Sequence, residues 1–88
     1  MKLHNLMEDE VVAAVDKITE GMNDVCRCEI CRLDMASIAL NNLKPKYVVT
    51  DKGEVFAKAY SLDFQFSTDL VAEVTKAIEI VKKNPRHK

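Results

Sequence analysis

The chain has 88 residues, of which 48% are hydrophobic and 31% are charged, and its formal net charge at pH 7 is −1. This composition is typical of a globular domain and excludes a disordered chain, while the near-neutral charge provides no general attraction to nucleic acid or to an anionic membrane. We therefore expect one domain over residues 1–88. Its core is small enough that a metal ion, a disulfide or a partner chain is needed for ample stability.

The start of the chain and its hydrophobic pattern predict a cytoplasmic protein. The opening sequence MKLHNLMEDE contains no apolar run of the kind found in a signal peptide. No stretch of about 18 consecutive apolar residues, the length that spans a membrane, occurs anywhere in the sequence. Thiols stay reduced in the cytoplasm, so clustered cysteines there indicate metal or redox chemistry before a disulfide framework.

The first predicted element is a helix that begins near Asn5 and ends before Gly21. Asn5 suits the N-cap position, and Glu8 follows three residues later as in a capping box. Gly21 and the Asn23–Asp24 pair suit the end of the helix. The apolar face expected for this helix comprises Leu3, Leu6, Met7, Val11, Ala14, Val15 and Ile18.

A second helix is predicted directly after the cysteines, and it carries two apolar faces. One face comprises Leu33, Ala36, Leu40 and Leu43, and the other comprises Met35, Ile38 and Ala39. A short helix that is apolar on both sides should be buried on both sides, either within its own core or against a second copy of the chain. Because the core of so short a chain is small, this helix favours a homodimer. Lys44–Pro45 ends the helix, since a residue before proline is disfavoured in the helical conformation.

The region that follows is expected to be extended before a last helix begins. Tyr47–Thr50 and Val55–Ala57 flank a turn, a pattern that predicts a small hairpin. Ser67 or Thr68 is expected to cap the last helix, which Asn84–Pro85 ends. The apolar stripe of that helix comprises Leu70, Val71, Val74, Ala77, Ile78 and Val81. The predicted fold class is therefore mainly α: a small helical domain of three main helices, with a short extended or hairpin segment before the last, that forms a homodimer.

All three cysteines of the chain lie in one short segment, as Cys26, Cys28 and Cys31. Zinc prefers tetrahedral sites of thiolate or imidazole ligands, and a C-x-x-C turn supplies two thiolates. The spacing predicts a structural zinc site, because no good general base lies nearby and a metal would help so small a domain to fold. The candidates for the fourth ligand are a water molecule, a residue of another copy, His4, His87 and Asp34, about one helical turn after Cys31.

Other interpretations of the cysteines stay open. They can be small apolar residues of the core, or Cys28 and Cys31 can be the redox pair of a thiol–disulfide oxidoreductase. A thioredoxin-like pair normally accompanies a βαβ pattern, and an iron–sulfur cluster normally needs a fourth cysteine; the sequence has neither. No catalytic constellation is visible, and two glycines are too few for a glycine-rich nucleotide loop. We therefore do not expect an enzyme.

Charged and aromatic residues that could bind a ligand lie on both sides of the second helix. Lys44, Lys46 and Tyr47 follow it, and two ammonium groups with an aromatic ring could hold phosphates and stack a guanine. A solvated helix end with a tyrosine that anchors the loop is the commoner use of such residues. Arg27 and Arg32 flank the cysteines, where they could neutralise thiolates, bind an anion or be ordinary exposed charges.

One continuous pattern runs from the cysteines into the predicted hairpin: C-x-C-x-x-C-x-x-D-x-A-x-x-A-L-N-x-L-x-P-x-Y. Its residues are Cys26, Cys28, Cys31, Asp34, Ala36, Ala39, Leu40, Asn41, Leu43, Pro45 and Tyr47. Near the amino terminus, Asn5-Leu6-Met7-Glu8 with Val11 and Val12 adds to it. Together these residues resemble the late competence development protein ComFB family, over the chain up to about Gly53, with the last helix similar in type.

The resemblance implies a small, mainly helical homodimer with a zinc site at the cysteines. Some cyanobacterial members of that family are receptors for cyclic di-GMP, and the family is linked to competence and to regulation rather than to a known reaction. The predicted function is thus a cytoplasmic regulatory or adaptor protein that binds cyclic di-GMP, through Lys44, Lys46 and Tyr47, or a protein partner. The alternative is a thiol–disulfide oxidoreductase that uses Cys28 and Cys31. Nucleic acid is not an expected partner.

Overall fold

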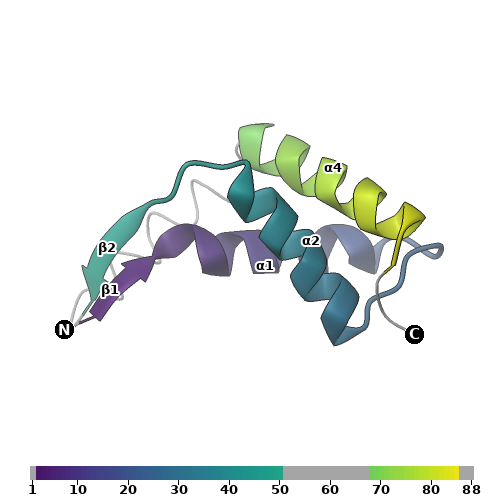
Figure 1. The fold of residues 1–88 in the computed structure, drawn as a ribbon, viewed down its shortest axis with the longest axis horizontal. Helices are drawn as coiled ribbons and strands as arrows, with labels where there is room; N and C mark the ends of the chain where they lie inside the picture. The colour runs from purple at the N-terminus through teal and green to yellow at the C-terminus, as the bar shows by residue number, and fades with distance from the viewer. Residues whose placement is uncertain (1, 51–67, 86–88) are drawn as a thin grey trace.

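A computed structural model of the protein describes residues 2–50 and 68–85. The elements of this part of the chain are, in order, β1 (Lys2–Asn5), α1 (Leu6–Glu20), α2 (Glu29–Asn41), β2 (Tyr47–Thr50) and α4 (Thr68–Lys83). Helix α2 packs against both α1 and α4, and the two strands pair with each other (Figure 1). The predicted fold, three main helices with a short extended segment before the last, is confirmed.

The two strands form a small antiparallel sheet in which Leu3 lies opposite Val49 and Asn5 lies opposite Tyr47. We expected Leu3 on the apolar face of the first helix, and this was wrong: Leu3 belongs to β1 and is 74% exposed. The helix starts later because the Asn5 side chain caps it, and residues before an N-cap are extended. The predicted strand at Tyr47–Thr50 is confirmed, whereas its expected partner Val55–Ala57 lies outside the described residues.

Asn5 joins the start of α1 to the connection between α2 and β2. Its Oδ1 accepts a hydrogen bond from the amide of Met7, 3.1 Å away, and a second from the amide of Lys46, 2.9 Å away. The amide of Leu6 donates to the carbonyl of Lys46 at 2.7 Å. At the other end of α1, Gly21 is the C-cap, as predicted.

The core lies where the three helices meet. Its largest fully buried side chains are Met35, Leu70, Ile78, Val11, Val15, Val74 and Cys31. Full burial of a side chain of this size stabilises the folded state by roughly 1.5–3 kcal/mol. The face of α2 that carries Met35 and Ala39 is completely buried. Its other face is only partly covered, since Leu40 is half-buried and Leu33 is 48% exposed.

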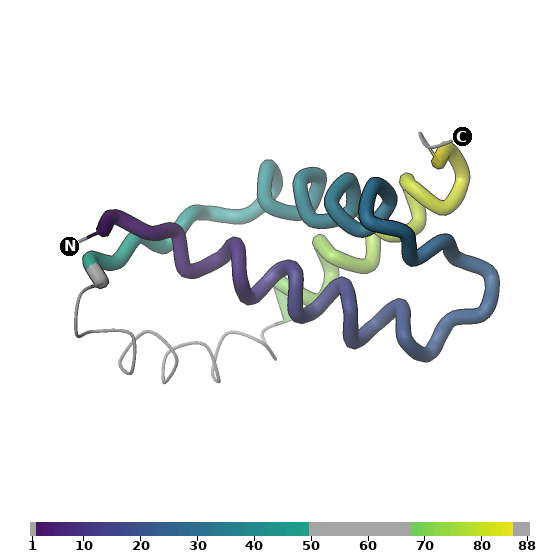
Figure 2. The backbone as a smooth tube through the Cα atoms, turned by 90° about the horizontal axis from the view of Figure 1, so that it is seen from below, coloured from purple at the N-terminus to yellow at the C-terminus, as the bar shows by residue number. Residues whose placement is uncertain are grey.

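Thr68 is the first residue of α4, so it belongs to the helix and is not its N-cap. The alternative cap, Ser67, lies outside the described residues. Near the other end of α4, Lys82 pairs with Asp24 at 2.5 Å. This ion pair places the end of α4 beside the connection from α1 to α2, which carries the cysteines. Figure 2 shows that connection at the opposite end of the molecule from the two strands.

No helix in the described part of the chain is both long enough and apolar enough to cross a membrane.

Candidate metal centre and neighbouring cavities

The three cysteines come together at the start of α2. Their Sγ atoms all lie within 4.8 Å of one another. Cys26 is half-buried, Cys28 is exposed and Cys31 is buried. Three sulfur atoms at this separation form a donor set that fits a thiolate-binding metal such as zinc.

Local backbone geometry accounts for the cluster. Cys28 is the N-cap of α2, with extended backbone angles, and its Sγ accepts a hydrogen bond from the amide of Cys31 at 3.4 Å. A sulfur atom thus takes the position that a serine or aspartate oxygen usually occupies at an N-cap. Because the N-cap side chain bonds to the amide three residues later, the C-x-x-C spacing itself brings the two sulfur atoms close together.

The two cysteines of this turn have opposite pKa shifts. The amide of Cys31 is the main cause that lowers the pKa of Cys28, because it stabilises the thiolate. Burial raises the pKa of Cys31 to about 12, and the neighbouring thiols add to that increase. A bound cation would stabilise the thiolate of Cys31 and so offset the free-energy cost of ionising a buried thiol, since metal-bound thiols are deprotonated.

The structure separates the candidates for a fourth ligand. His4 pairs with Asp9 at 3.2 Å, near the start of α1. The 15 residues of α1 span about 22 Å, so His4 of the same chain does not reach the cysteines. Asp34 lies in α2 after Cys31 and is half-buried; it does not belong to the group of three clustered ligand atoms. Its role as a ligand stays a prediction, and His87 lies outside the described residues.

Beside the cluster, Arg32 forms a bidentate pair with Asp16 of α1. The two hydrogen bonds run from Nε to Oδ1 at 2.6 Å and from a terminal nitrogen to Oδ2 at 2.9 Å. The bond to Arg32 lowers the pKa of Asp16, and the same bond raises the pKa of Arg32. The sequence offered no signal for this pair, because Asp16 is one of several acidic residues on the polar side of α1.

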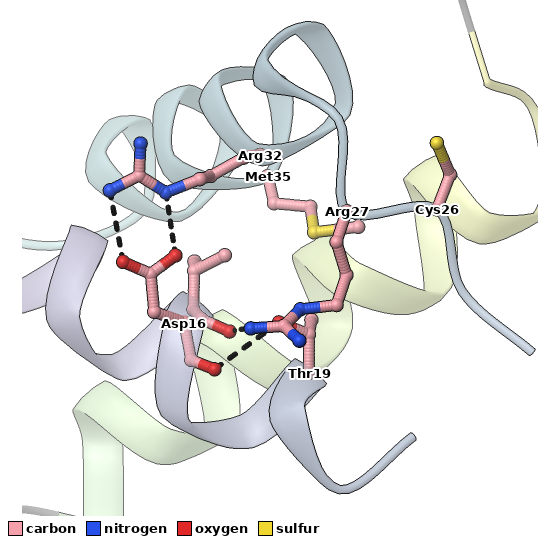
Figure 3. Close-up of a pocket in the computed structure, with 7 residues that line it drawn as sticks. Asp16, Thr19, Cys26, Arg27, Arg32 and Met35 are labelled. Carbon is pink, nitrogen blue, oxygen red and sulfur yellow. Dashed lines mark hydrogen bonds and ion pairs between the residues drawn. The ribbon is translucent and has the colours of Figure 1, made fainter. Parts of the chain in front are cut away.

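The Asp16–Arg32 pair borders a cavity of about 450 Å³. The other residues that line it are Val15, Thr19, Cys26, Arg27 and Met35 (Figure 3). The cavity therefore lies between α1, α2 and the connection that carries the cysteines.

Two of the three residues predicted to bind a nucleotide share another cavity. Lys44 and Lys46 line a space of about 660 Å³ together with Asp69, Glu73 and Lys76 from α4. The α4 residues were not recognised in the sequence, because the packing of distant segments brings them there. Tyr47, the third predicted residue, lines a different hollow of about 620 Å³.

That hollow belongs to an exposed apolar surface, which we call the leucine–tyrosine face and define by Leu3, Leu33, Leu40, Leu43, Tyr47 and Val49. Leu33, Leu40, Leu43 and Tyr47 line the hollow. The strand register puts Leu3 opposite Val49, and alternation along β2 places Tyr47 on their side of the sheet. Tyr47 is 60% exposed and Val49 is 59% exposed. Contiguous exposed apolar side chains indicate an interaction surface.

The architecture and the site define a class of protein: a small helical domain whose described residues form three helices, a two-stranded sheet and a cluster of thiols at a helix start. The family model of the late competence development protein ComFB matches residues 4–85 of the chain. The chain therefore belongs to the ComFB family, as the resemblance in its sequence predicted.

A protein sequence and a solved structure, both from Bacillus subtilis, support this assignment. Competence protein ComFB of strain 168 is 25% identical over 83 residues, which cover 94% of this chain and 85% of the relative. A solved structure of the late competence protein ComFB from the same species matches with a TM-score of 0.79 and 25% identity. That match covers 96% of this chain and 94% of the solved one.

Proposed function

We propose that this competence-related protein is a regulatory or adaptor protein whose three cysteines hold a structural zinc ion, and that it acts in the cytoplasm as a homodimer. The observation that carries the metal is the approach of three Sγ atoms to within 4.8 Å at the start of α2. The domain is small, so a metal at this position would add stability that its core supplies only in part.

The surroundings of the cysteines favour a structural metal. Cys31 is buried in the core, and Cys28 is the cap of α2. A metal bound to Cys26, Cys28 and Cys31 would tie the α1–α2 connection to the first turn of α2. Zinc suits the role because it accepts thiolates in a tetrahedral site, with the fourth position open to Asp34, water or a residue of another copy.

Native mass spectrometry of the purified protein, before and after chelation, tests both the metal and the assembly. We expect a dimer that carries zinc on each chain and loses it to the chelator. A monomer without metal, with three thiols that all react with an alkylating reagent, would contradict both parts of the proposal.

The surface that supports the homodimer is the leucine–tyrosine face. It contains the apolar side of α2 that the chain leaves partly uncovered, and a second copy is the partner that presents a matching apolar surface. Leu33→Glu should give a monomer by light scattering at concentrations where the native chain is dimeric. Ile80→Glu changes an equally exposed residue of α4 that lies outside this face, so it should stay dimeric. If both variants remained dimeric, the leucine–tyrosine face would not be the dimer interface.

The cavity that contains Lys44 and Lys46 supports a role in sensing cyclic di-GMP. Lys76 brings a third ammonium group to it, against the carboxylates of Asp69 and Glu73, and its volume of about 660 Å³ falls within the range of ligand pockets, about 300–1,000 Å³. Calorimetric titration with cyclic di-GMP should detect binding that Lys44→Gln and Lys46→Gln weaken. Tyr47→Ala tests whether the tyrosine belongs to the same site. No heat of binding in the native chain would exclude this role.

A second candidate function is thiol–disulfide exchange. The observation that favours it is an exposed Cys28 of lowered pKa beside the buried Cys31, the usual arrangement of an attacking and a resolving thiol. Turnover of a small disulfide substrate by the protein as purified would support this function. A metal-loaded protein whose thiols react slowly, without turnover, would count against it.

A further inference from the structure

We propose that the cavity of about 450 Å³ between α1 and the cysteine-bearing connection binds a small oxyanion, a phosphate or a carboxylate group, through Arg27. This site is separate from the cavity of Lys44 and Lys46, and it does not require the function proposed above.

The walls of the cavity combine apolar and charged residues. Val15 and Met35 are buried core residues, and they form an apolar wall. Arg27 comes from the connection before α2, and Figure 3 shows its side chain extending toward Asp16 and Thr19 of α1. A ligand in the cavity would therefore meet both apolar side chains and a guanidinium group.

Two guanidinium groups, those of Arg27 and Arg32, line the cavity with one carboxylate, that of Asp16. Both carboxylate oxygens of Asp16 accept hydrogen bonds from Arg32, so these two charges neutralise each other. Within residues 2–50 and 68–85, the Arg27 side chain forms no hydrogen bond and no ion pair, and its charge contributes less than that of Arg32 to the lowered pKa of Asp16. The carboxylate of Asp16 and the guanidinium groups of Arg27 and Arg32 thus sum to a charge of +1.

The guanidinium group of Arg27 determines which class of ligand the cavity can bind. A guanidinium group offers paired N–H donors that match the oxygens of a phosphate or a carboxylate. The Asp16–Arg32 pair would hold α1 and α2 in position around the ligand without repelling it. The cavity has the size of a small-molecule site, and Val15 and Met35 would accommodate an apolar body attached to the anionic group.

The test is an NMR titration of the full chain with inorganic phosphate in one arm and acetate in the other, at constant ionic strength set with chloride. We expect saturable shifts of the amide signals of Arg27 and Thr19 in at least one arm, and the stronger arm identifies the preferred group. Arg27→Gln should weaken binding about tenfold, the usual effect of losing a charge-assisted hydrogen bond. Arg27 is exposed, so this variant should fold normally.

Lys2→Gln is the matched control, because it removes the same charge from an exposed residue of β1, which precedes α1 and lies far from the cavity. It should leave the affinity unchanged. Shifts that never saturate with either anion would overturn the proposal. Equal weakening by Arg27→Gln and Lys2→Gln would also overturn it, because that result would mean a general charge effect rather than a site.

Discussion

Asp16 and Arg32 are joined by two parallel hydrogen bonds of 2.6 and 2.9 Å that connect the middle of α1 to the first turns of α2. Arg32 directly follows Cys31, so this pair anchors the cysteine-bearing turn to Asp16 of α1, a residue 16 positions earlier in the sequence. The fixed fork geometry of arginine makes such a contact directional as well as charged. The position of the candidate metal centre therefore depends on a contact outside the cysteines.

Removing this pair should lower the melting temperature by a few degrees. Both side chains are partly exposed, so solvent screening keeps the effect well below that of a buried pair. A double-mutant cycle of Asp16→Ala and Arg32→Ala, measured by thermal unfolding, should show a clear coupling between the two residues. The same cycle on Glu73 and Lys76, an exposed pair at 3.7 Å, is the control and should show almost none. Additive effects at Asp16 and Arg32 would mean that the pair contributes no stability.

The same pair predicts a pH dependence of stability. Arg32 lowers the pKa of Asp16 in the folded state, so the unfolded state binds more protons in acid and stability rises with pH there. The contribution of Asp16 should be complete above the ordinary aspartate pKa of 3.8 and should be lost as the pH falls below it, through the folded-state pKa. Urea unfolding of the native chain and of Asp16→Asn, at a series of acidic pH values, checks this. The two curves should converge in acid, and a constant separation would contradict the prediction.

Asn5→Ala should lower the free energy of unfolding by about 1–2 kcal/mol. The substitution removes the N-cap of α1 and also leaves the amide of Lys46 without its acceptor. Asn42→Ala is the matched control, because its amide group makes an exposed hydrogen bond to the carbonyl of Ile38 and its loss should cost less than about 0.5 kcal/mol. Equal losses in urea unfolding would show that the link between Asn5 and Lys46 adds nothing to stability.

Cys28→Ser should lower both the zinc content and the melting temperature. Serine is itself a preferred N-cap, so a loss of stability in this variant cannot come from a missing cap and must come from the lost metal ligand. Metal analysis and thermal unfolding of the same sample test the two effects together. A variant with full zinc content and an unchanged melting temperature would exclude Cys28 as a ligand.

After chelation, the thiols should react with iodoacetamide in a defined order. Only the thiolate reacts, and Cys28 is exposed with a lowered pKa, while burial raises the pKa of Cys31 to about 12. Peptide mapping at neutral pH should therefore find Cys28 labelled well before Cys31. Labelling of Cys31 before Cys28 would contradict this prediction, because a buried thiol could react first only if the core of the metal-free protein opened.

The features that the sequence determined by itself are local. Asn5 and Gly21 bound the first helix because each acts on backbone groups within one turn of its own position. Cys28 and Cys31 approach each other because the side chain of Cys28, as the N-cap, accepts a hydrogen bond from the amide of Cys31. These arrangements depend on short-range backbone geometry, which the order of residues specifies without reference to the rest of the chain.

The tertiary structure alone decided which distant residues meet. Leu3 looked like part of a helix face, yet pairing with Val49 places it in a strand, because register depends on both partners. Packing of α4 against α2 placed Lys76 in the same cavity as Lys44, whereas Tyr47 lines a different hollow. The pairing of Asp16 with Arg32 likewise required the helices to be packed first, since a side chain's sequence neighbours carry no information about which helix will lie across from it.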